Sequence, residues 1–225
     1  MDTLNFVVRV ANEQDFHYAE QICDEMAASA KARGTGIARR TPESIQQKML
    51  AGKAVIAVTD DEHQAWAGFA YIEAWSEGRF VSNSGLIVSP LFRKYGLATR
   101  IKANIFELSR TRYPEAKVFG LTTGLAVMKI NSELGFEPVT YSEIPQDESF
   151  WAGCQSCINH DILMSKGRKN CLCTAMLYDP FEQKVIANNV SNNHNIRVAA
   201  APATGKSQAA KQRKHTLPTL RPLAR

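Results

Sequence analysis

Apolar and polar positions along the chain form blocks that predict strands and helices in a mixed order. The run Phe6–Val10 is rich in β-branched residues and predicts a first strand. From Asn12 to about Ala30, apolar residues recur at helical spacing behind a capping segment, which predicts a helix. A shorter helix is expected from Thr41 to near Gly52, because Pro42 suits a first helical turn.

Three strand-like segments follow this helical region. They are Ala54–Thr59, Ala65–Trp75 and Phe80–Val88. The polar stretch Asp60–His63 separates the first two and predicts a hairpin. Pro90 ends the third segment, because proline has no N–H for the ladder.

The next part of the chain predicts two helices and three strands. Leu97 to about Arg112 has apolar residues at i, i+4, i+8 and i+11, as in an amphipathic helix. The other expected elements are a strand at Lys117–Thr123, a helix at Ala126–Leu134 closed by Gly135, and strands at Phe136–Tyr141 and Cys171–Tyr178. The order β-α-α-β-β-β-α-β-α-β-β predicts an α/β or α+β fold with one mixed sheet.

The composition changes near Asn188 and divides the chain into two parts. Beyond this point, asparagine pairs, an alanine-rich stretch and scattered Lys and Pro show low hydrophobicity and no periodicity. Such a segment buries too little apolar surface to offset the entropy of ordering. We therefore expect one domain over residues 1–187 and a basic, disordered tail over 188–225.

Charge is distributed unevenly and argues against nucleic acid as a partner of the folded part. The net charge is +5, but residues 181–225 hold eight Lys and Arg against the single acid Glu182. The preceding 180 residues carry 19 bases and 21 acids. The basic character therefore belongs to the tail, which lacks the interleaved aromatic residues of a single-strand binder.

Nothing in the sequence suggests export or membrane insertion. Met1–Leu4 has neither a basic nor an apolar signal region, and no apolar run approaches the roughly 20 residues that span a bilayer. Five cysteines in 225 residues do not make a secreted disulfide scaffold. We expect a cytoplasmic protein without a membrane partner; a homodimer is compatible with the sequence, which does not fix the oligomeric state.

The turn between Pro90 and Leu97 has the composition of a phosphate-binding loop. The first N–H groups of a helix lack intrahelical partners and point outward at the positive end of the dipole, where phosphate binds. Glycine allows a close approach of the backbone, and basic side chains add charge. The predicted loop consists of Arg93, Lys94, Tyr95, Gly96, Leu97 and Ala98.

Two motifs resemble those of a known superfamily. Arg93-x-x-Gly96-x-Ala98, behind a strand that ends in Val-x-Pro, resembles motif A of the GCN5-related N-acetyltransferases (GNAT superfamily). Leu134-Gly135-Phe136 resembles the end of motif B, and the resemblance covers roughly residues 4–180. It implies a GNAT fold, acetyl-CoA or another acyl-CoA as co-substrate, and a small-molecule amine as acceptor.

The resemblance also implies where acyl-CoA binds. The cofactor would lie between Leu86–Val88 and the strand at Lys117–Thr123, with the main chain of Ile87 and Val88 along the pantetheine arm. The N–H groups of the loop would hold the pyrophosphate. A main-chain N–H near Ile87 would stabilise the oxyanion of the tetrahedral intermediate.

The sequence departs from the family pattern at both acid–base positions. The general-acid tyrosine of many members is Asn131 here, and the general-base glutamate falls near Ser82. Asn131 can donate a hydrogen bond to the sulfur but no proton. Glu73 is the candidate base, acting through water, and Glu77 is the next; the alternative for each is a solvated surface glutamate. Positioning and oxyanion stabilisation can still support catalysis.

In the GNAT fold the loop after the first helix borders the acceptor. Here it contains Arg33, Arg39 and Arg40, and guanidinium groups bind carboxylates in a bidentate fork. The loop therefore suggests an acidic acceptor such as glutamate, as in the short enzymes that acylate glutamate at the start of arginine synthesis. The alternative is a flexible basic loop.

The spacing Cys154-x-x-Cys157 followed by Cys171-x-Cys173 suggests metal ligation. Cysteines two apart in a strand share a face, so four sulfurs could form a tetrahedral, structural zinc site. The alternatives are small buried side chains or a redox pair.

Three functions remain open from the sequence. The first is an N-acyltransferase for a small acidic amine, and the second is a protein or peptide N-acetyltransferase. The third is a catalytically silent GNAT domain that senses acyl-CoA or binds a partner, which the loss of both acid–base residues favours.

Overall fold

The computed structural model describes residues 4–34 and 38–183, except for the side chain of Arg33. The chain divides into two units, Met1–Ile186 and Ala187–Arg225, and every described residue belongs to the first. The predicted tail, residues 188–225, lies outside the described part.

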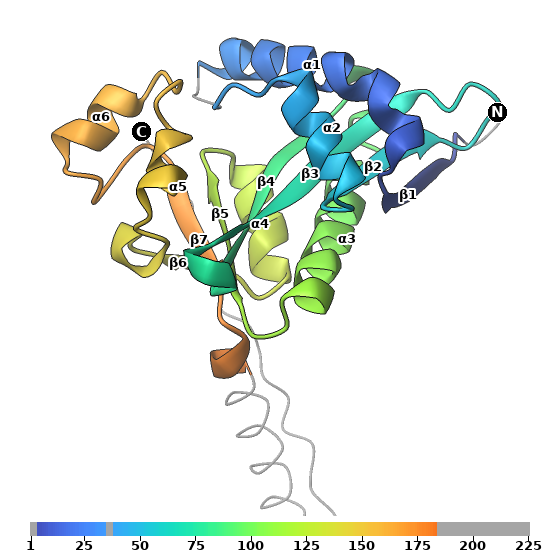
Figure 1. The fold of residues 1–225 in the computed structure, drawn as a ribbon. Coiled ribbons are helices and arrows are strands. Elements are labelled where there is room, and N and C mark those ends of the chain that lie inside the picture. The colour runs from blue at the N-terminus through green and yellow to red at the C-terminus, as the bar shows by residue number, and fades with distance from the viewer. Residues whose placement is uncertain (1–3, 35–37, 184–225) are drawn as a thin grey trace, which may run out of the picture. The chain divides into compact units, whose positions relative to one another are not determined.

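A seven-stranded mixed sheet forms the centre of the first unit (Figure 1). Its strand order is β1-β2-β3-β4-β5-β7-β6. The β4–β5 pair is parallel and the other pairs are antiparallel. The strands are β1 (Phe6–Val10), β2 (Ala54–Thr59), β3 (Trp66–Trp75), β4 (Phe80–Val88), β5 (Lys117–Thr122), β6 (Glu137–Val139) and β7 (Thr174–Tyr178). The predicted mixed sheet is confirmed.

Helices cover both faces of the sheet. One face is covered by α1 (Ala19–Arg33) and α2 (Pro42–Leu50), and the other by α3 (Leu97–Arg112) and α4 (Leu125–Glu133) (Figure 1). Between β6 and β7 the chain forms α5 (Glu148–Ala152) and α6 (His160–Ser165), which pack on the β5–β7 end of the sheet.

Burial on both faces explains why the central strands are continuous apolar runs. In β2, Ile56 and Val58 pack with α1 and α2, whereas Val55 and Ala57 pack with α3. All six residues of β2 are buried. A strand covered on both sides shows no polar alternation, which is why this segment reads as a short hydrophobic block.

The structure differs from the expected elements in three places. The predicted first helix is a 3-10 turn, Glu13–Tyr18, followed by α1. Asn12 caps this turn, and its main-chain N–H donates to the Asp15 carboxylate at 2.9 Å. The final strand begins at Thr174, so Cys171 and Cys173 precede it. The short helices α5 and α6 were not expected, because five and six residues are too few to show a helical period.

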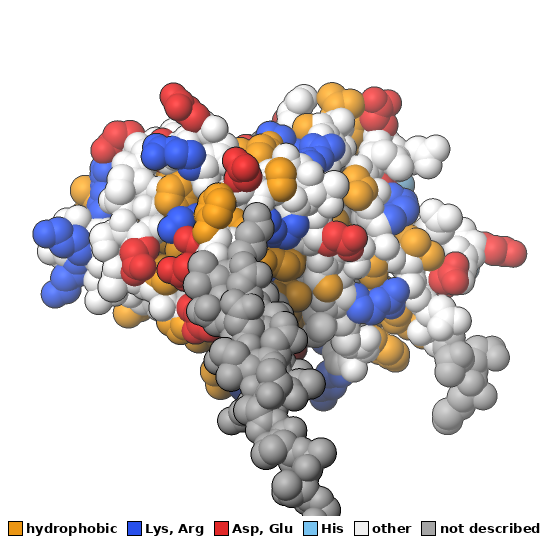
Figure 2. Space-filling model, turned by 90° about the horizontal axis from the view of Figure 1, so that it is seen from below, with side chains coloured by type: hydrophobic (Ala, Val, Ile, Leu, Met, Phe, Trp, Pro, Cys, Tyr) orange, Lys and Arg blue, Asp and Glu red, His pale blue; other side chains and the backbone are white. Residues whose placement is uncertain are grey.

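None of the helices within residues 4–34 and 38–183 is long and apolar enough to cross a bilayer. On the face shown in Figure 2, acidic and basic side chains of the described residues are interspersed. That face therefore presents mixed charge rather than a basic patch.

Candidate functional site

The sheet opens between β4 and β5. The two strands pair only through Phe80–Ser82 and Lys117–Phe119, and no further β4–β5 pair follows among the described residues. We call the opening between residues 83–88 of β4 and residues 120–122 of β5 the fork. A narrow pocket lies in it, lined among others by Asn83, Ser84, Lys102, Gly120 and Asn131.

The predicted phosphate loop has the backbone of an open anion site. Lys94 and Gly96 adopt left-handed φ values of 72° and 73°, and α3 begins at Leu97 without a side-chain cap. A Cβ on Gly96 would meet no atom within 4 Å. The first-turn N–H groups of α3 therefore remain open to a ligand at the positive end of the helix.

The side chains of the loop are anchored in different ways. Arg93 donates to Glu25 Oε1 at 3.0 Å and Ser29 Oγ at 3.1 Å, so its guanidinium ties the loop to α1. Tyr95 is about half exposed and meets the Phe6 ring edge-on, with centroids 5.5 Å apart. Leu97 is buried and fixes the start of α3 in the core. Phosphate contact by the Arg93 side chain, now paired with Glu25, stays a prediction.

Asn131 on α4 lies at the fork with an unused acceptor. Its side chain is 1% exposed, and its Nδ2 donates weakly to the sulfur of Met176 at 3.6 Å. Its Oδ1 has no hydrogen-bond partner among the described residues. A buried acceptor without a partner costs about 1–3 kcal/mol, and this oxygen is free to accept a hydrogen bond from a water or a ligand in the pocket.

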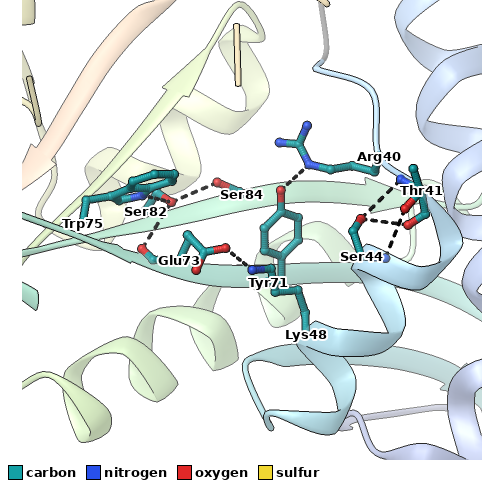
Figure 3. Close-up of polar contacts among 9 residues, drawn as sticks. All are labelled: Arg40, Thr41, Ser44, Lys48, Tyr71, Glu73, Trp75, Ser82 and Ser84. Atoms are coloured by element: carbon teal, nitrogen blue, oxygen red, sulfur yellow. Dashed lines mark hydrogen bonds and ion pairs between the residues drawn. The ribbon is translucent and has the colours of Figure 1, made fainter. Parts of the chain in front are cut away.

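Ser82, at the family's glutamate position, is held in a hydrogen-bond chain and offers no base. It is buried and accepts from Trp75 Nε1 at 3.0 Å, and Ser84 donates to it at 3.2 Å (Figure 3). It also donates to the main-chain oxygen of Glu73 at 3.4 Å. A neutral hydroxyl engaged on three sides does not remove a proton from an amine.

Two cations gather at one tyrosine on the α2 face of the sheet. Arg40 and Lys48 lie 5.7 and 5.9 Å from the centre of the Tyr71 ring, and Arg40 Nε donates to the Tyr71 hydroxyl (Figure 3). Lys48 forms an ion pair with Glu73. We call Arg40, Lys48, Tyr71 and Glu73 the Tyr71 cluster. It carries one net positive charge and can accept a carboxylate.

The other predicted acid–base and acceptor residues lie apart from this cluster or outside the description. Glu77 is exposed in the turn after β3, with a φ of 59°. Arg39 is exposed, and its main-chain N–H donates to Ser156 Oγ at 2.9 Å, which brings the segment between β6 and β7 against the loop. The side chain of Arg33 lies outside the described part.

The predicted zinc site stays a prediction. No three His, Cys, Asp or Glu side chains within residues 4–34 and 38–183 are placed to hold a metal ion. The main-chain N–H of Asn159 donates to Cys157 Sγ at 3.4 Å, and Cys171 Sγ donates to the main-chain oxygen of Asn159 at 3.8 Å. Cys171 and Cys173 precede β7, so the shared strand face expected for them does not exist.

Two of the four thiols lie beside a small core. Cys154 and Cys171 pack against the cluster that contains Tyr141 and Trp151. Burial, followed by the neighbouring cysteines, raises the pKa of Cys154 and raises that of Cys173 to about 12. The cysteines raise one another's pKa because their sulfurs lie near one another.

Sequence reasoning missed a buried lysine in the fork. Lys102 on α3 is 3% exposed, and its Nζ donates to Asn83 Oδ1 at 2.8 Å. It lies 4.7 Å from the centre of the Phe136 ring. The signal that could have found it is its position between Ile101 and Ile105, on the apolar side of the predicted helix.

Comparisons with known proteins give structural neighbours only. No family model matches the sequence, and no curated protein matches it. N-acetylglutamate synthase from Neisseria gonorrhoeae, complexed with coenzyme A and N-acetyl-glutamate, matches with a TM-score of 0.53 and 17% identity over 79% of this chain. The match covers 36% of that protein, so this chain spans about a third of its length.

Two other neighbours match over nearly their whole length. A Mycobacterium tuberculosis protein in complex with CoA and NLQ has a TM-score of 0.55 and 16% identity, covering 77% of this chain and 98% of that one. An acetyltransferase of the GNAT family from Staphylococcus aureus has a TM-score of 0.53 and 10% identity, covering 78% and 99%. At these identities the likeness concerns the fold. Together with the forked sheet and the open start of α3, it shows that the chain has the fold of the GCN5-related N-acetyltransferase superfamily.

Proposed function

We propose that this chain is an acyl-CoA-dependent N-acetyltransferase for a small amine. The observation that carries the proposal is the fork, which opens beside the uncapped start of α3. The fork leaves strand edges for an extended amide-bearing arm, and the helix start offers N–H groups to a pyrophosphate. Acyl-CoA contains both parts in one molecule.

In this proposal the main chain of β4 binds the pantetheine arm. Leu86, Ile87 and Val88 lie on the fork side of β4, and the N–H groups of residues 94–98 face the pyrophosphate. A main-chain N–H near Ile87 stabilises the oxyanion when the amine attacks the thioester. The unpartnered Oδ1 of Asn131 receives an N–H from the arm, and its Nδ2 donates a hydrogen bond to the sulfur of the thioester.

Replacing Gly96 by aspartate should weaken acetyl-CoA binding at least tenfold. Aspartate tolerates the left-handed φ of 73°, and a side chain here has free space, so the fold is retained. Its carboxylate would face the pyrophosphate and repel it. Calorimetry with acetyl-CoA measures the effect. Gly96→Asn, with the same shape and no charge, is the matched control; equal binding by both variants would place the phosphates elsewhere.

The Tyr71 cluster supports an acidic acceptor, and we propose glutamate as the first candidate. Arg40 and Lys48 supply two cations to a site that holds one carboxylate, Glu73. One carboxylate of the acceptor, from its side chain or its α-position, would neutralise the remaining positive charge of the cluster. The N-acetyl-glutamate bound to the Neisseria synthase agrees with this choice.

Glu73 is the proposed general base within the same cluster. It lies on β3 opposite Ser82, and its carboxylate is 26% exposed, so water reaches it. When the acceptor carboxylate binds Lys48, the Glu73 carboxylate is released from its ion pair. It can then receive the proton of the attacking amine through water.

The experiment that tests the function is a thiol-release assay. Acetyl-CoA and succinyl-CoA are each offered glutamate, aspartate, glutamine, polyamines and peptides with free N-termini. We expect thiol release with acetyl-CoA and glutamate. Turnover of peptides alone would instead support a protein or peptide N-acetyltransferase.

Arg40→Ala should raise the KM for glutamate about 10- to 100-fold, the scale of one charged hydrogen bond. The KM for acetyl-CoA should stay the same, because Arg40 lies at Tyr71 and outside the fork. Glutamine serves as the internal control, since it lacks the side-chain charge. An equal rise for every acceptor would mean that Arg40 only shapes the loop.

A second candidate is an acyl-CoA sensor without catalysis. The Lys48–Glu73 ion pair and the asparagine at position 131 favour it, because Glu73 is paired in the structure and an amide has no proton to give. Tight acetyl-CoA binding in the calorimeter with no thiol release for any acceptor would establish this function instead.

A further inference from the structure

The fork holds a buried cation that the acyl transfer outlined above does not use. Lys102 is 3% exposed; its Nζ donates a hydrogen bond to Asn83 and lies over the face of the Phe136 ring. None of the ion pairs found in the described part of the chain includes it. An ammonium buried without a counter-ion is costly, and such groups concentrate at functional sites.

The ionisable groups on the elements packed around Lys102 do not compensate its charge. They pair elsewhere or face solvent: Lys117 on β5 binds Asp179 at 2.7 Å, Arg110 on α3 lies over the Tyr178 ring of β7, Glu107 and Lys129 are exposed, and Glu73 on β3 pairs with Lys48. Burial alone lowers the pKa of Lys102 to about 7. A group with this pKa gives up and regains a proton readily at neutral pH.

Lys102 and Asn131 line the same pocket from two different helices. Asn83, which accepts from Lys102, is the first β4 residue beyond the last β4–β5 pair, at the inner end of the fork. A Cβ on Gly120 of β5 would lie 3.5 Å from the main-chain oxygen of Asn83 and 4.0 Å from Asn131 Nδ2. Lys102 at the Asn83 side chain and Asn131 across from Gly120 thus border the same pocket at the inner end of the fork.

We propose, resting on the acyl-transfer function above, that Lys102 donates the proton to the departing CoA sulfur, a task that Asn131 cannot perform. The acceptor amine attacks the thioester carbonyl, and a new C–N bond forms as the carbonyl oxygen becomes an oxyanion. The ammonium nitrogen of this intermediate loses its proton to the base through water. The oxyanion then collapses, the C–S bond breaks, and the sulfur takes a proton from Lys102. The products are the amide and CoA thiol; neutral Lys102 recovers its proton from solvent.

The first test does not depend on turnover. Free CoA is bound to the protein, and its thiolate is titrated by ultraviolet absorbance, with CoA lacking the sulfur atom as the blank. The bound thiolate and the ammonium stabilise each other and titrate as a coupled pair, so the thiol should ionise at a lower pH than in free CoA. Lys102→Met should abolish this shift, whereas Lys129→Met, an exposed lysine on α4, should keep it.

The second test uses the pH dependence of kcat with the best acceptor. A donor must be protonated, so the parent's kcat should fall as pH rises above about 7. Lys102→Met should reduce kcat about 10²- to 10⁴-fold and lose this alkaline decline. Lys102→Arg keeps the charge but does not release a proton, so it should preserve the shifted thiol pKa and still lose kcat.

Each result bears directly on the proposal. The same thiol pKa in the parent and in Lys102→Met would overturn it, as would a kcat within threefold of the parent in that variant. A shifted thiol pKa without turnover by the parent for any acceptor would overturn the acyl-transfer function, and the catalytic role with it. A shifted pKa, loss of kcat and loss of the alkaline decline together support Lys102 as the donor.

Discussion

The Lys102→Met protein is expected to be more stable than the parent at pH 7, by about 1–3 kcal/mol. Methionine has a similar length and removes a charge that lies in the core with no ionic partner. The lost hydrogen bond to Asn83 reduces the gain, but Asn83 is only partly buried, so water can replace the donor. Most core substitutions destabilise, so a stabilising one would be diagnostic.

The stability advantage of Lys102→Met over the parent should decrease as pH rises. In the folded state Lys102 has a pKa of about 7, and in the unfolded chain its value is the ordinary 10.5. Between these values the unfolded state binds more protons, so the parent becomes more stable as pH rises, by up to about 1.4 kcal/mol per unit. Denaturant titrations of both proteins at pH 7 and pH 9 test this. The methionine variant should lose its advantage at pH 9.

Lys129→Met is the matched control for stability. This lysine is exposed on α4, and its replacement should change the free energy of unfolding by less than about 0.5 kcal/mol. A Lys102→Met protein that is less stable than the parent at pH 7 would show that the ammonium supports the fold. A variant that is more stable but inactive would show a residue kept for function at the expense of stability.

Gly85→Ala should destabilise the protein by about 2–5 kcal/mol and impair acceptor binding. Gly85 has a left-handed φ of 67°, and a Cβ there would lie 2.6 Å from Cε1 of Tyr71 and 3.0 Å from Cε of Met26. The left-handed backbone costs about 1–2 kcal/mol for a residue with a side chain, and the clash adds about 1–3 kcal/mol. Moving the Tyr71 ring would also displace Arg40.

The measurement combines denaturant unfolding with the KM values of both substrates. The acceptor KM should rise more than the KM for acetyl-CoA, because Tyr71 belongs to the Tyr71 cluster. Gly96→Ala is the control for stability, since its φ is 73° but its Cβ would meet nothing within 4 Å. If the two alanine variants are equally stable, the tyrosine ring moves aside without cost.

The sequence predicted the helices and strands whose limits are set by residues within or next to them. The limits of β2, β4 and α3 agree with the structure, because these are long apolar blocks or periodic stretches bounded by turn residues and proline. The open start of α3 also follows from local signals, namely a strand stop, basic residues and a glycine. Short α5 and α6 lack such signals, since contacts with the β5–β7 end of the sheet stabilise them.

The arrangement of the site could be predicted only in part. The β4–β5 opening was inferred from a resemblance, whereas the pairing of Arg93 with Glu25 and of Lys48 with Glu73 joins residues that are 68 and 25 positions apart. Such long-range pairs leave no periodic mark in a sequence. The start of the last strand was predicted wrongly, because Cys171 and Cys173 lie ahead of β7.

The short β4–β5 pairing has a consequence for folding. Three residue pairs are the direct ladder between the β1–β4 part of the sheet and the β5–β7–β6 part. A ligand bound in the fork would connect the two parts of the sheet where β4 and β5 do not pair. By mass action, a ligand present at about 100 times its Kd adds about 2.7 kcal/mol to the free energy of unfolding. The abundance of the folded chain would then follow the supply of its own co-substrate.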